Sequence, residues 1–330
     1  MDAERAVLDL ASRLEVGPPA TVWNLALFPL LLKGSTALDG ADYLLYEQAE
    51  SMALVSIAEV GETGVVGELL VENRAMRPVL IVEGEVLLGM KQTRVLNVSI
   101  LVPAQSRLIV PVSCVEAGRW HRVSEHATGR AAVHLAPSIR AAKAVTVGRS
   151  MRSARTFSSD QHAVWARVDQ VLDSSDVDSP THSYSDFASQ ELERLTGMAQ
   201  GIKPATDQVG VIAYLGRQAL CADVFGGAAV LTSLWSGLLS SYLADAGTAR
   251  SKSRSVHAPA IAATWFRSIT SGSASVGPEL GLGHHVGVVG PGVEACALVH
   301  ENRILHLSAF PAHDGIQRAR FVSPAGRRPS

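Results

Sequence analysis

The chain has 330 residues and a formal net charge of −2, with 47% hydrophobic and 18% charged residues. This length predicts one large or two medium domains, and the composition is typical of a globular protein. The small net charge excludes the strong basic field that drives sequence-independent nucleic-acid binding.

No apolar run reaches the roughly 18 residues of a membrane span, and the acidic start of the chain lacks the order of a signal peptide. The cysteines are Cys114, Cys221 and Cys296, which are odd in number and far apart. This spacing argues against a disulfide framework and against a cysteine metal cluster. We therefore expect a cytoplasmic protein without a membrane partner, and the sequence indicates no metal site and identifies no cofactor.

The first part of the chain predicts one helix followed by many short strands. Apolar residues at helical spacing over 3–14 end at Gly17-Pro18-Pro19, which predicts an N-terminal helix and linker over residues 1–20. A strand-like run over 24–32 and a short helix over 43–54 follow. Turn residues then separate β-type runs at 55–60, 67–71, 79–88, 95–101 and 108–115.

The second part of the chain predicts more helices. Residues 131–149 are rich in alanine and fit either a helix or a strand. Helices are predicted after Ser159-Asp160, over 187–195, over 228–246 with Gly247 at its end, and near 258–269. Hairpins are predicted over 208–226 and at the end of the chain, where the turn is Glu301-Asn302-Arg303.

Together these elements predict an α+β protein with an antiparallel β-sandwich or barrel-like core. The helices are expected mainly from the C-terminal half. Residues 21–330 are expected to form a single domain, with polar loops near 173–185 and 247–257.

The segment VEGEVLLGMKQTR, residues 82–94, places charged and amide side chains in a very apolar region. A two-residue turn at Gly89-Met90 would set Glu85 opposite Arg94. The segment is then either a solvated hairpin face with one cross-strand ion pair, worth about 0.2–1 kcal/mol, or the wall of a site. Lys91, Gln92 and Arg94 supply hydrogen-bond donors suited to phosphate or carboxylate.

A second polar cluster, PVSCVEAGRW, follows at residues 111–120. Cys114 is either a nucleophile, which would need a nearby base and a lowered thiol pKa, or a buried thiol. Glu116 could act as a general acid or base. Arg119 next to Trp120 suits stacking on a base or sugar, and is also a common surface pair.

These two clusters resemble the ARG-and-Rhodanese-Phosphatase-superfamily-associated protein domain family. The resemblance spans about residues 23–310 and extends to the final HLSAF, which contains His306. Met90 and Thr93 depart from the usual glycine and asparagine of the family. The matching central positions are Asn73, Pro78, Gly84, Glu85, Lys91, Gln92, Arg94, Asn97, Pro103, Pro111, Ser113, Cys114, Glu116, Gly118, Arg119 and Trp120.

The resemblance implies a connection with NAD or ADP-ribose chemistry, in stress or immune signalling, because relatives occur beside ADP-ribosylglycohydrolase and rhodanese or phosphatase domains. This implication rests on association alone. We therefore expect an enzyme, a hydrolase or transferase, that acts on an ADP-ribose-like, NAD-like or other phosphate-bearing nucleotide.

In this hypothesis Lys91, Arg94 and Arg119 hold phosphates with help from Gln92 and His306, and Trp120 stacks on the ligand. Glu85 and Glu116 are the expected acid–base pair, with Cys114 as a further catalytic candidate. Two alternatives use the same residues: a sensor that binds a small anionic ligand without turnover, and a structural or assembly protein. A homo-oligomer is compatible with each of them.

Overall fold

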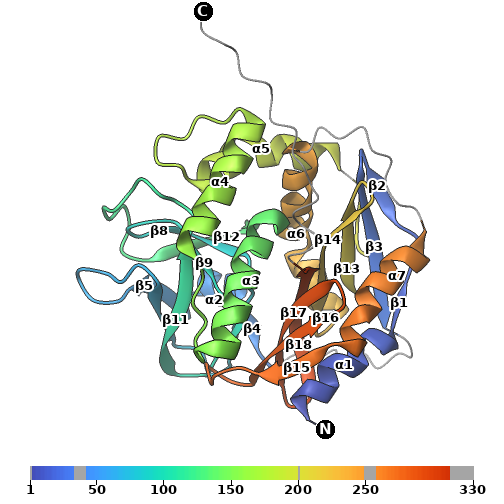
Figure 1. The fold of residues 1–330 in the computed structure, drawn as a ribbon. Coiled ribbons are helices and arrows are strands. Elements are labelled where there is room, and N and C mark those ends of the chain that lie inside the picture. The colour runs from blue at the N-terminus through green and yellow to red at the C-terminus, as the bar shows by residue number, and fades with distance from the viewer. Residues whose placement is uncertain (1, 33–41, 200, 249–257, 313–330) are drawn as a thin grey trace, which may run out of the picture.

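The computed structural model describes residues 2–32, 42–199, 201–248 and 258–312. It consists of a large antiparallel sheet, a curled smaller sheet, and a layer of helices between them (Figure 1). The predicted polar loop near 247–257 lies almost entirely outside the described residues.

The large sheet is antiparallel and draws its strands from both ends of the chain. Side chains alternate along each strand, so both faces of the sheet carry apolar residues, and helices pack on both faces. Val211 and Ala213 belong to one apolar cluster, and Ile212 and Tyr214 belong to another. In spatial order the strands are β1 (Leu14–Val16), β3 (Leu25–Leu32), β13 (Gln208–Leu215), β14 (Gln218–Phe225), β18 (Arg303–Pro311), β17 (Val293–His300), β16 (His284–Gly290) and β15 (Ser273–Val276), with β2 (Ala20–Val22) beside β3.

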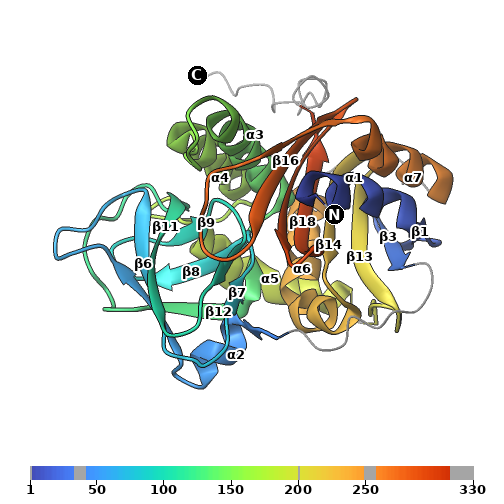
Figure 2. The same ribbon diagram turned by 90° about the horizontal axis from the view of Figure 1, so that it is seen from below.

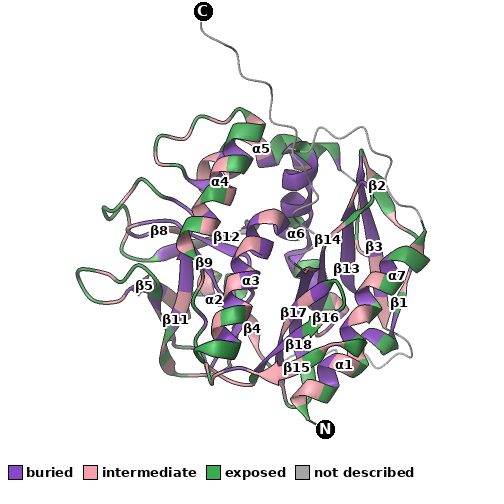
Figure 3. Ribbon diagram, in the orientation of Figure 1, coloured by how far each residue is buried: buried purple, intermediate pink, exposed green. Residues whose placement is uncertain are grey.

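Short helices cover one face of this sheet and a long helix covers the other. The first face packs against α1 (Ala3–Arg13), α7 (Pro259–Arg267) and the 3₁₀ helix η1 (Ser268–Ser271). The second face packs against α6 (Ala228–Thr248). Every residue of α6 from Leu238 to Ala246 is buried, including the polar Ser240, Ser241 and Asp245, and most of this stretch is apolar (Figure 3).

The smaller sheet curls into a half-barrel. Its edge strands β12 and β5 approach each other at a bridge between Ala58 and His126. The short β10 (Ile100–Val102), β7 (Val79–Ile81) and β4 (Leu44–Leu45) form a third sheet, in which β4 runs parallel to β7 and leads into α2 (Tyr46–Ser51). The half-barrel strands are β12 (Ala127–His134), β8 (Glu85–Gly89), β9 (Arg94–Leu96), β11 (Ser106–Cys114), β6 (Glu68–Asn73) and β5 (Val55–Glu59).

Helix α3 (Pro137–Ser153) lies between the half-barrel and the large sheet (Figures 1 and 2). It packs against α4 (Gln161–Ser175), which α5 (Tyr184–Met198) follows along the chain. The Asp160 carboxylate accepts hydrogen bonds from the backbone of His162 and Ala163, so it is the N-cap of α4. Among the described residues, no helix combines the length and apolar character needed to cross a membrane.

The predicted α+β class with an antiparallel core is confirmed, and helices occur in both halves of the chain. Both predicted hairpins form, and Glu301 and Asn302 have the positive φ angles of a tight turn. Other boundaries were wrong. Residues 79–88 and 95–101 are each split into two short strands, and Gly247 lies inside α6 rather than after it. The alanine-rich segment 131–149, for which the sequence left helix and strand open, is divided between β12 and α3.

Candidate functional site

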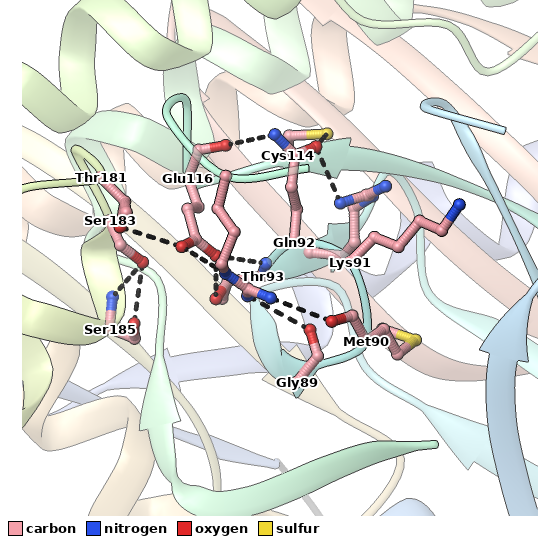
Figure 4. A network of polar contacts seen from close by, with 12 residues as sticks. Gly89, Met90, Lys91, Gln92, Thr93, Cys114, Glu116, Thr181, Ser183 and Ser185 are labelled. Carbon is pink, nitrogen blue, oxygen red and sulfur yellow. Dashed lines mark hydrogen bonds and ion pairs between the residues drawn. The ribbon is translucent and has the colours of Figure 1, made fainter. Parts of the chain in front are cut away.

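The Glu116 carboxylate is the centre of a polar network just beyond the end of β11 (Figure 4). It accepts hydrogen bonds from the Thr93 backbone (2.9 Å) and hydroxyl (3.0 Å), and from the Thr181 hydroxyl (2.9 Å). Arg119 donates two more, at 2.7 and 2.6 Å. Burial alone would raise the pKa of Glu116, but these partners outweigh it and lower that pKa. Glu116 is therefore an ionised carboxylate, and both of its oxygens accept hydrogen bonds from neighbouring residues.

Arg119 also fixes the turn between β8 and β9. Its Nη1 donates to the Met90 carbonyl (2.9 Å), and its Nη2 lies 3.4 Å from the Gly89 carbonyl. Both turn residues have positive φ angles, 52° at Met90 and 95° at Gly89. The guanidinium thus links the two polar clusters of the sequence.

The β8–β9 turn is longer than predicted, and this changes the register. Leu87 pairs with Arg94, and Val86 pairs with Val95. The predicted cross-strand ion pair between Glu85 and Arg94 is therefore wrong. The nearest carboxylate to Arg94 in an ion pair is Glu59, 3.9 Å from Nη2.

Arg94 is the least satisfied cation of the network. Its Nη1 donates to the Gln92 side-chain oxygen at 3.1 Å. Its Nε and Nη2 are buried and make no hydrogen bond to the described residues. The Arg94 guanidinium lies 5.5 Å from the ring centroid of Trp120, whose side chain is 45% exposed.

Lys91 also lies near this ring, and its side chain extends away from Glu116 (Figure 4). Its Nζ lies 5.4 Å from the Trp120 ring centroid and donates to the carbonyls of Glu62 (3.1 Å) and Thr63 (2.5 Å). The structure thus brings Lys91 and Arg94 together around Trp120. We call these three residues the Trp120 corner.

Cys114 lies beneath this corner as a protonated thiol. Its Sγ is 3.1 Å from the Gln92 side-chain oxygen, and Gln92 in turn donates to the Glu116 carbonyl at 3.0 Å. Burial raises the pKa of Cys114 to about 11, despite the opposing charge of Arg94. A thiolate nucleophile needs a lowered pKa, so this environment favours the buried-thiol interpretation.

Glu85 lies apart from the Glu116 network. Its carboxylate accepts a hydrogen bond from the Val82 backbone at 2.9 Å. Burial raises the pKa of Glu85 to about 8. Among the described residues, no hydrogen bond or ion pair connects Glu85 with Glu116.

His306 lies elsewhere again, on β18 beside a buried ionic cluster. Arg140 of α3 donates two hydrogen bonds to Glu83, at 3.1 and 2.9 Å, and two to Asp223, at 3.1 and 2.6 Å. Lys143 is 2.8 Å from the other Glu83 oxygen. The side chains of Arg140, Lys143 and Asp223 are 0% exposed. We call Glu83, Arg140, Lys143, Asp223 and His306 the central cluster.

Sequence reasoning missed most of the central cluster. The available signal was a charged residue within an apolar run: Asp223 in ALCADVF, and Arg140 and Lys143 in the alanine-rich segment. Isolated charges in such runs require a partner when they are buried. Among the described residues, no group of three His, Cys, Asp or Glu side chains is arranged to hold a metal ion.

These features define an α+β protein in which helix α3 and one buried ionic cluster join a half-barrel to a large antiparallel sheet. The model of the ARG and Rhodanese-Phosphatase-superfamily-associated Protein domain matches residues 13–310, so the chain belongs to that family. Comparison with curated proteins and with solved structures gives no match.

Proposed function

We propose that this protein binds a phosphate-bearing, nucleotide-like ligand at the Trp120 corner. The observation that carries the proposal is the buried Arg94 guanidinium, with two nitrogens that make no hydrogen bond to the described residues. Glu59 balances the charge of Arg94 from 3.9 Å, which is too far for a hydrogen bond, and buried donors without a hydrogen bond are costly. A phosphate oxygen supplies the acceptors that these nitrogens lack.

The neighbouring side chains suit the same ligand. Trp120 presents a half-exposed ring on which a base can stack, and the Lys91 ammonium lies beside it. The Arg94 side chain is 0% exposed, so ligand binding requires a covering side chain to move, and we propose that the partly exposed Trp120 beside it does so. Stacking of the base on the displaced ring would offset the loss of the Trp120–Arg94 contact.

Binding without turnover agrees better with these contacts than hydrolysis by Glu85 and Glu116. Glu116 is occupied by Thr93, Thr181 and Arg119, and the Cys114 thiol is protonated, with its pKa raised to about 11. Hydrolysis of an ADP-ribose-like or NAD-like substrate is the enzymatic form of the proposal. It would require these groups to exchange partners when the ligand binds.

A structural role is the second candidate, and one observation favours it. Several residues of the family motif make hydrogen bonds that hold neighbouring segments of the protein together. The Asn73 amide donates to the carbonyls of Val102 (3.3 Å) and Pro103 (2.8 Å), and the Ser113 hydroxyl donates to the Asn97 side chain. In this alternative the motif residues hold the half-barrel together and the Trp120 corner takes no ligand.

The test is a thermal-shift and calorimetric titration with ADP-ribose, NAD and inorganic pyrophosphate. At a hundredfold excess over Kd, a ligand that binds only the folded protein stabilises it by about 2.7 kcal/mol. We expect this stabilisation in the wild-type protein and its loss in Arg94→Met, which preserves much of the apolar volume without the donors.

The matched control is Arg107→Met, because Arg107 is exposed on β11 and pairs with Glu72 outside the corner. It should bind as the wild type does. Chromatography of the incubated nucleotides separates binding from turnover. Absence of a shift with every ligand, or unchanged binding by a folded Arg94→Met protein, would refute the proposal and leave the structural role.

A further inference from the structure

Ser99, His306 and Asp223 form a continuous chain of polar contacts within the buried interior. The Ser99 Oγ lies 2.7 Å from His306 Nδ1. On the other side of the imidazole, His306 Nε2 lies 3.5 Å from Asp223 Oδ1. The three side chains are respectively next to β10, on β18 and on β14, so only the tertiary fold brings them together.

The sheet register explains why His306 meets Asp223. Strands β14 and β18 pair with Asp223 opposite Ser308. His306 is two residues before Ser308, so it points to the same face and is the diagonal neighbour of Asp223. Phe225 stacks on the imidazole at 4.8 Å and fixes the plane of the ring.

The hydrogen bonds select one arrangement of protons along this chain. Ser99 Oγ accepts a hydrogen bond from the Glu83 backbone at 2.8 Å. Its own proton is therefore free to point at Nδ1 in the tautomer that carries the imidazole proton on Nε2. We assign this tautomer because Nε2 faces the Asp223 carboxylate and makes no hydrogen bond to another described residue.

Asp223 is held as an oriented carboxylate. The Tyr242 hydroxyl donates to its Oδ2 at 2.7 Å, and Arg140 donates to both oxygens. Burial alone would raise the pKa of Asp223, but the charge and hydrogen bonds of Arg140 and the neighbouring His306 together outweigh burial and hold that pKa well below its usual range. An ionised carboxylate facing Nε2 stabilises an imidazolium.

A cavity adjoins Ser99 and His306. Its volume is about 40 Å³, several times the roughly 10–15 Å³ that one water requires. Arg152 and Glu294 also line it and are more exposed than the residues at its inner end. The remaining walls are mainly apolar, with contributions from Val98, Val147, Met151 and Phe310. Such a slot suits a short acyl chain rather than a nucleotide.

We propose that Ser99, His306 and Asp223 form a nucleophile–base relay that hydrolyses small acyl esters in this cavity. Ser99 and His306 are the catalytic residues, and Asp223 is a positioning residue. The arrangement has the roles of a serine–histidine–aspartate triad, with the two imidazole nitrogens exchanged relative to the common order. This proposal is independent of ligand binding at the Trp120 corner.

The reaction balances with water as the only co-substrate. Ser99 Oγ attacks the carbonyl carbon as its proton moves to His306 Nδ1. The carbon–oxygen bond to the leaving group breaks, and Nδ1 returns the proton to the alkoxide, which leaves as an alcohol. Water then attacks the acyl group, its proton passes through Nδ1 to Ser99 Oγ, and the carboxylic acid departs.

The first test uses the unmodified full-length protein, so it does not depend on a variant that folds. The protein is treated with diisopropyl fluorophosphate, a small reagent for activated serines, and the adduct is located by peptide mass spectrometry. We expect the adduct on Ser99, with none on Ser113. That hydroxyl is an internal control, because it is also buried but bonds to Asn97 and Ser159 rather than to an imidazole.

The second test compares variants. His306→Gln, with its fold verified by circular dichroism, should lose the Ser99 adduct. Ser99→Ala should hydrolyse p-nitrophenyl acetate at least about 100-fold more slowly than the wild type, the range of a lost general acid–base step. Absence of a Ser99 adduct in the wild type, the same adduct in protein denatured beforehand, or equal hydrolysis by Ser99→Ala overturns the proposal.

Discussion

Two glutamates two residues apart, Glu83 and Glu85, have opposite protonation states. Burial raises the pKa of Glu85 to about 8, and the Val82 backbone donor only partly offsets this. Burial acts on Glu83 as well, but the Arg140 and Lys143 charges outweigh it and lower that pKa to about 2. A cation from a distant helix therefore decides which of the two carboxyls is charged at neutral pH.

The raised pKa of Glu85 predicts that the stability of Glu85→Gln, compared with that of the wild type, depends on pH. Because the folded pKa of Glu85 is raised, its stabilising contribution is fully present below the unfolded value of 4.5 and is lost as the pH rises towards about 8. Glutamine does not titrate, so the stability of the variant relative to wild type should increase with pH across this window. The slope should be at most about 1.4 kcal/mol per pH unit.

Urea unfolding at several pH values between about 5 and 8 measures this slope. Glu68→Gln on β6 is the control, because Glu68 is exposed. Parallel stability curves for Glu85→Gln and wild type would contradict the assigned environment of Glu85.

At the scale of elements, the break between β7 and β8 depends on Gly84. Its φ angle is +101°, a conformation that disfavours other residues. A Cβ at this position would lie 3.0 Å from Arg140 Nε and 3.2 Å from Arg140 Cδ. The glycine therefore allows the chain to turn between β7 and β8 and also lets α3 place the Arg140 guanidinium against the backbone.

Comparison of Gly84→Ala with Gly61→Ala tests both roles. Gly61 also has a positive φ angle, +68°, but a Cβ there meets nothing within 4 Å. Gly61→Ala should thus lower the free energy of unfolding only by the backbone strain, about 1–2 kcal/mol. Gly84→Ala should cost clearly more in urea unfolding, because Arg140 must also shift. Equal losses for the two variants would show that the close approach to Arg140 is unimportant.

At the scale of the whole molecule, Arg140 connects its two sheets. From α3 it bonds to Glu83 beside the half-barrel and to Asp223 in the large sheet, and its guanidinium lies 5.3 Å from the Phe310 ring centroid. A cation shared in this way makes separate unfolding of either part unfavourable, since each would leave a buried charge without its partner.

Arg140→Met should therefore destabilise the protein by about 3–5 kcal/mol, the cost of breaking a buried ion pair from one side. Calorimetry of the wild type should show one transition for the half-barrel and the large sheet together. Arg194→Met removes an exposed pair with Glu191 and should cost at most about 0.5 kcal/mol. Two separate wild-type transitions, or similar losses in the two variants, would contradict a linking role for Arg140.

The sequence by itself determined the α+β class, the two hairpins, the helix over most of residues 228–246 and the family, because these depend on local periodicity, turn residues and spaced motifs. It also predicted Lys91, Arg94, Glu116 and Arg119 as site residues, but the contact between their two polar clusters, through Arg119, is seen only in the structure.

Only the tertiary structure decided how the charged groups are partnered. The predicted pairing of Glu85 with Arg94 failed because a longer turn shifted the register, so that Arg94 lies opposite Leu87 instead. Ser99, Arg140, Asp223 and His306 come from four distant segments. Their contacts depend on how α3 and the two sheets pack, and no local pattern encodes that packing.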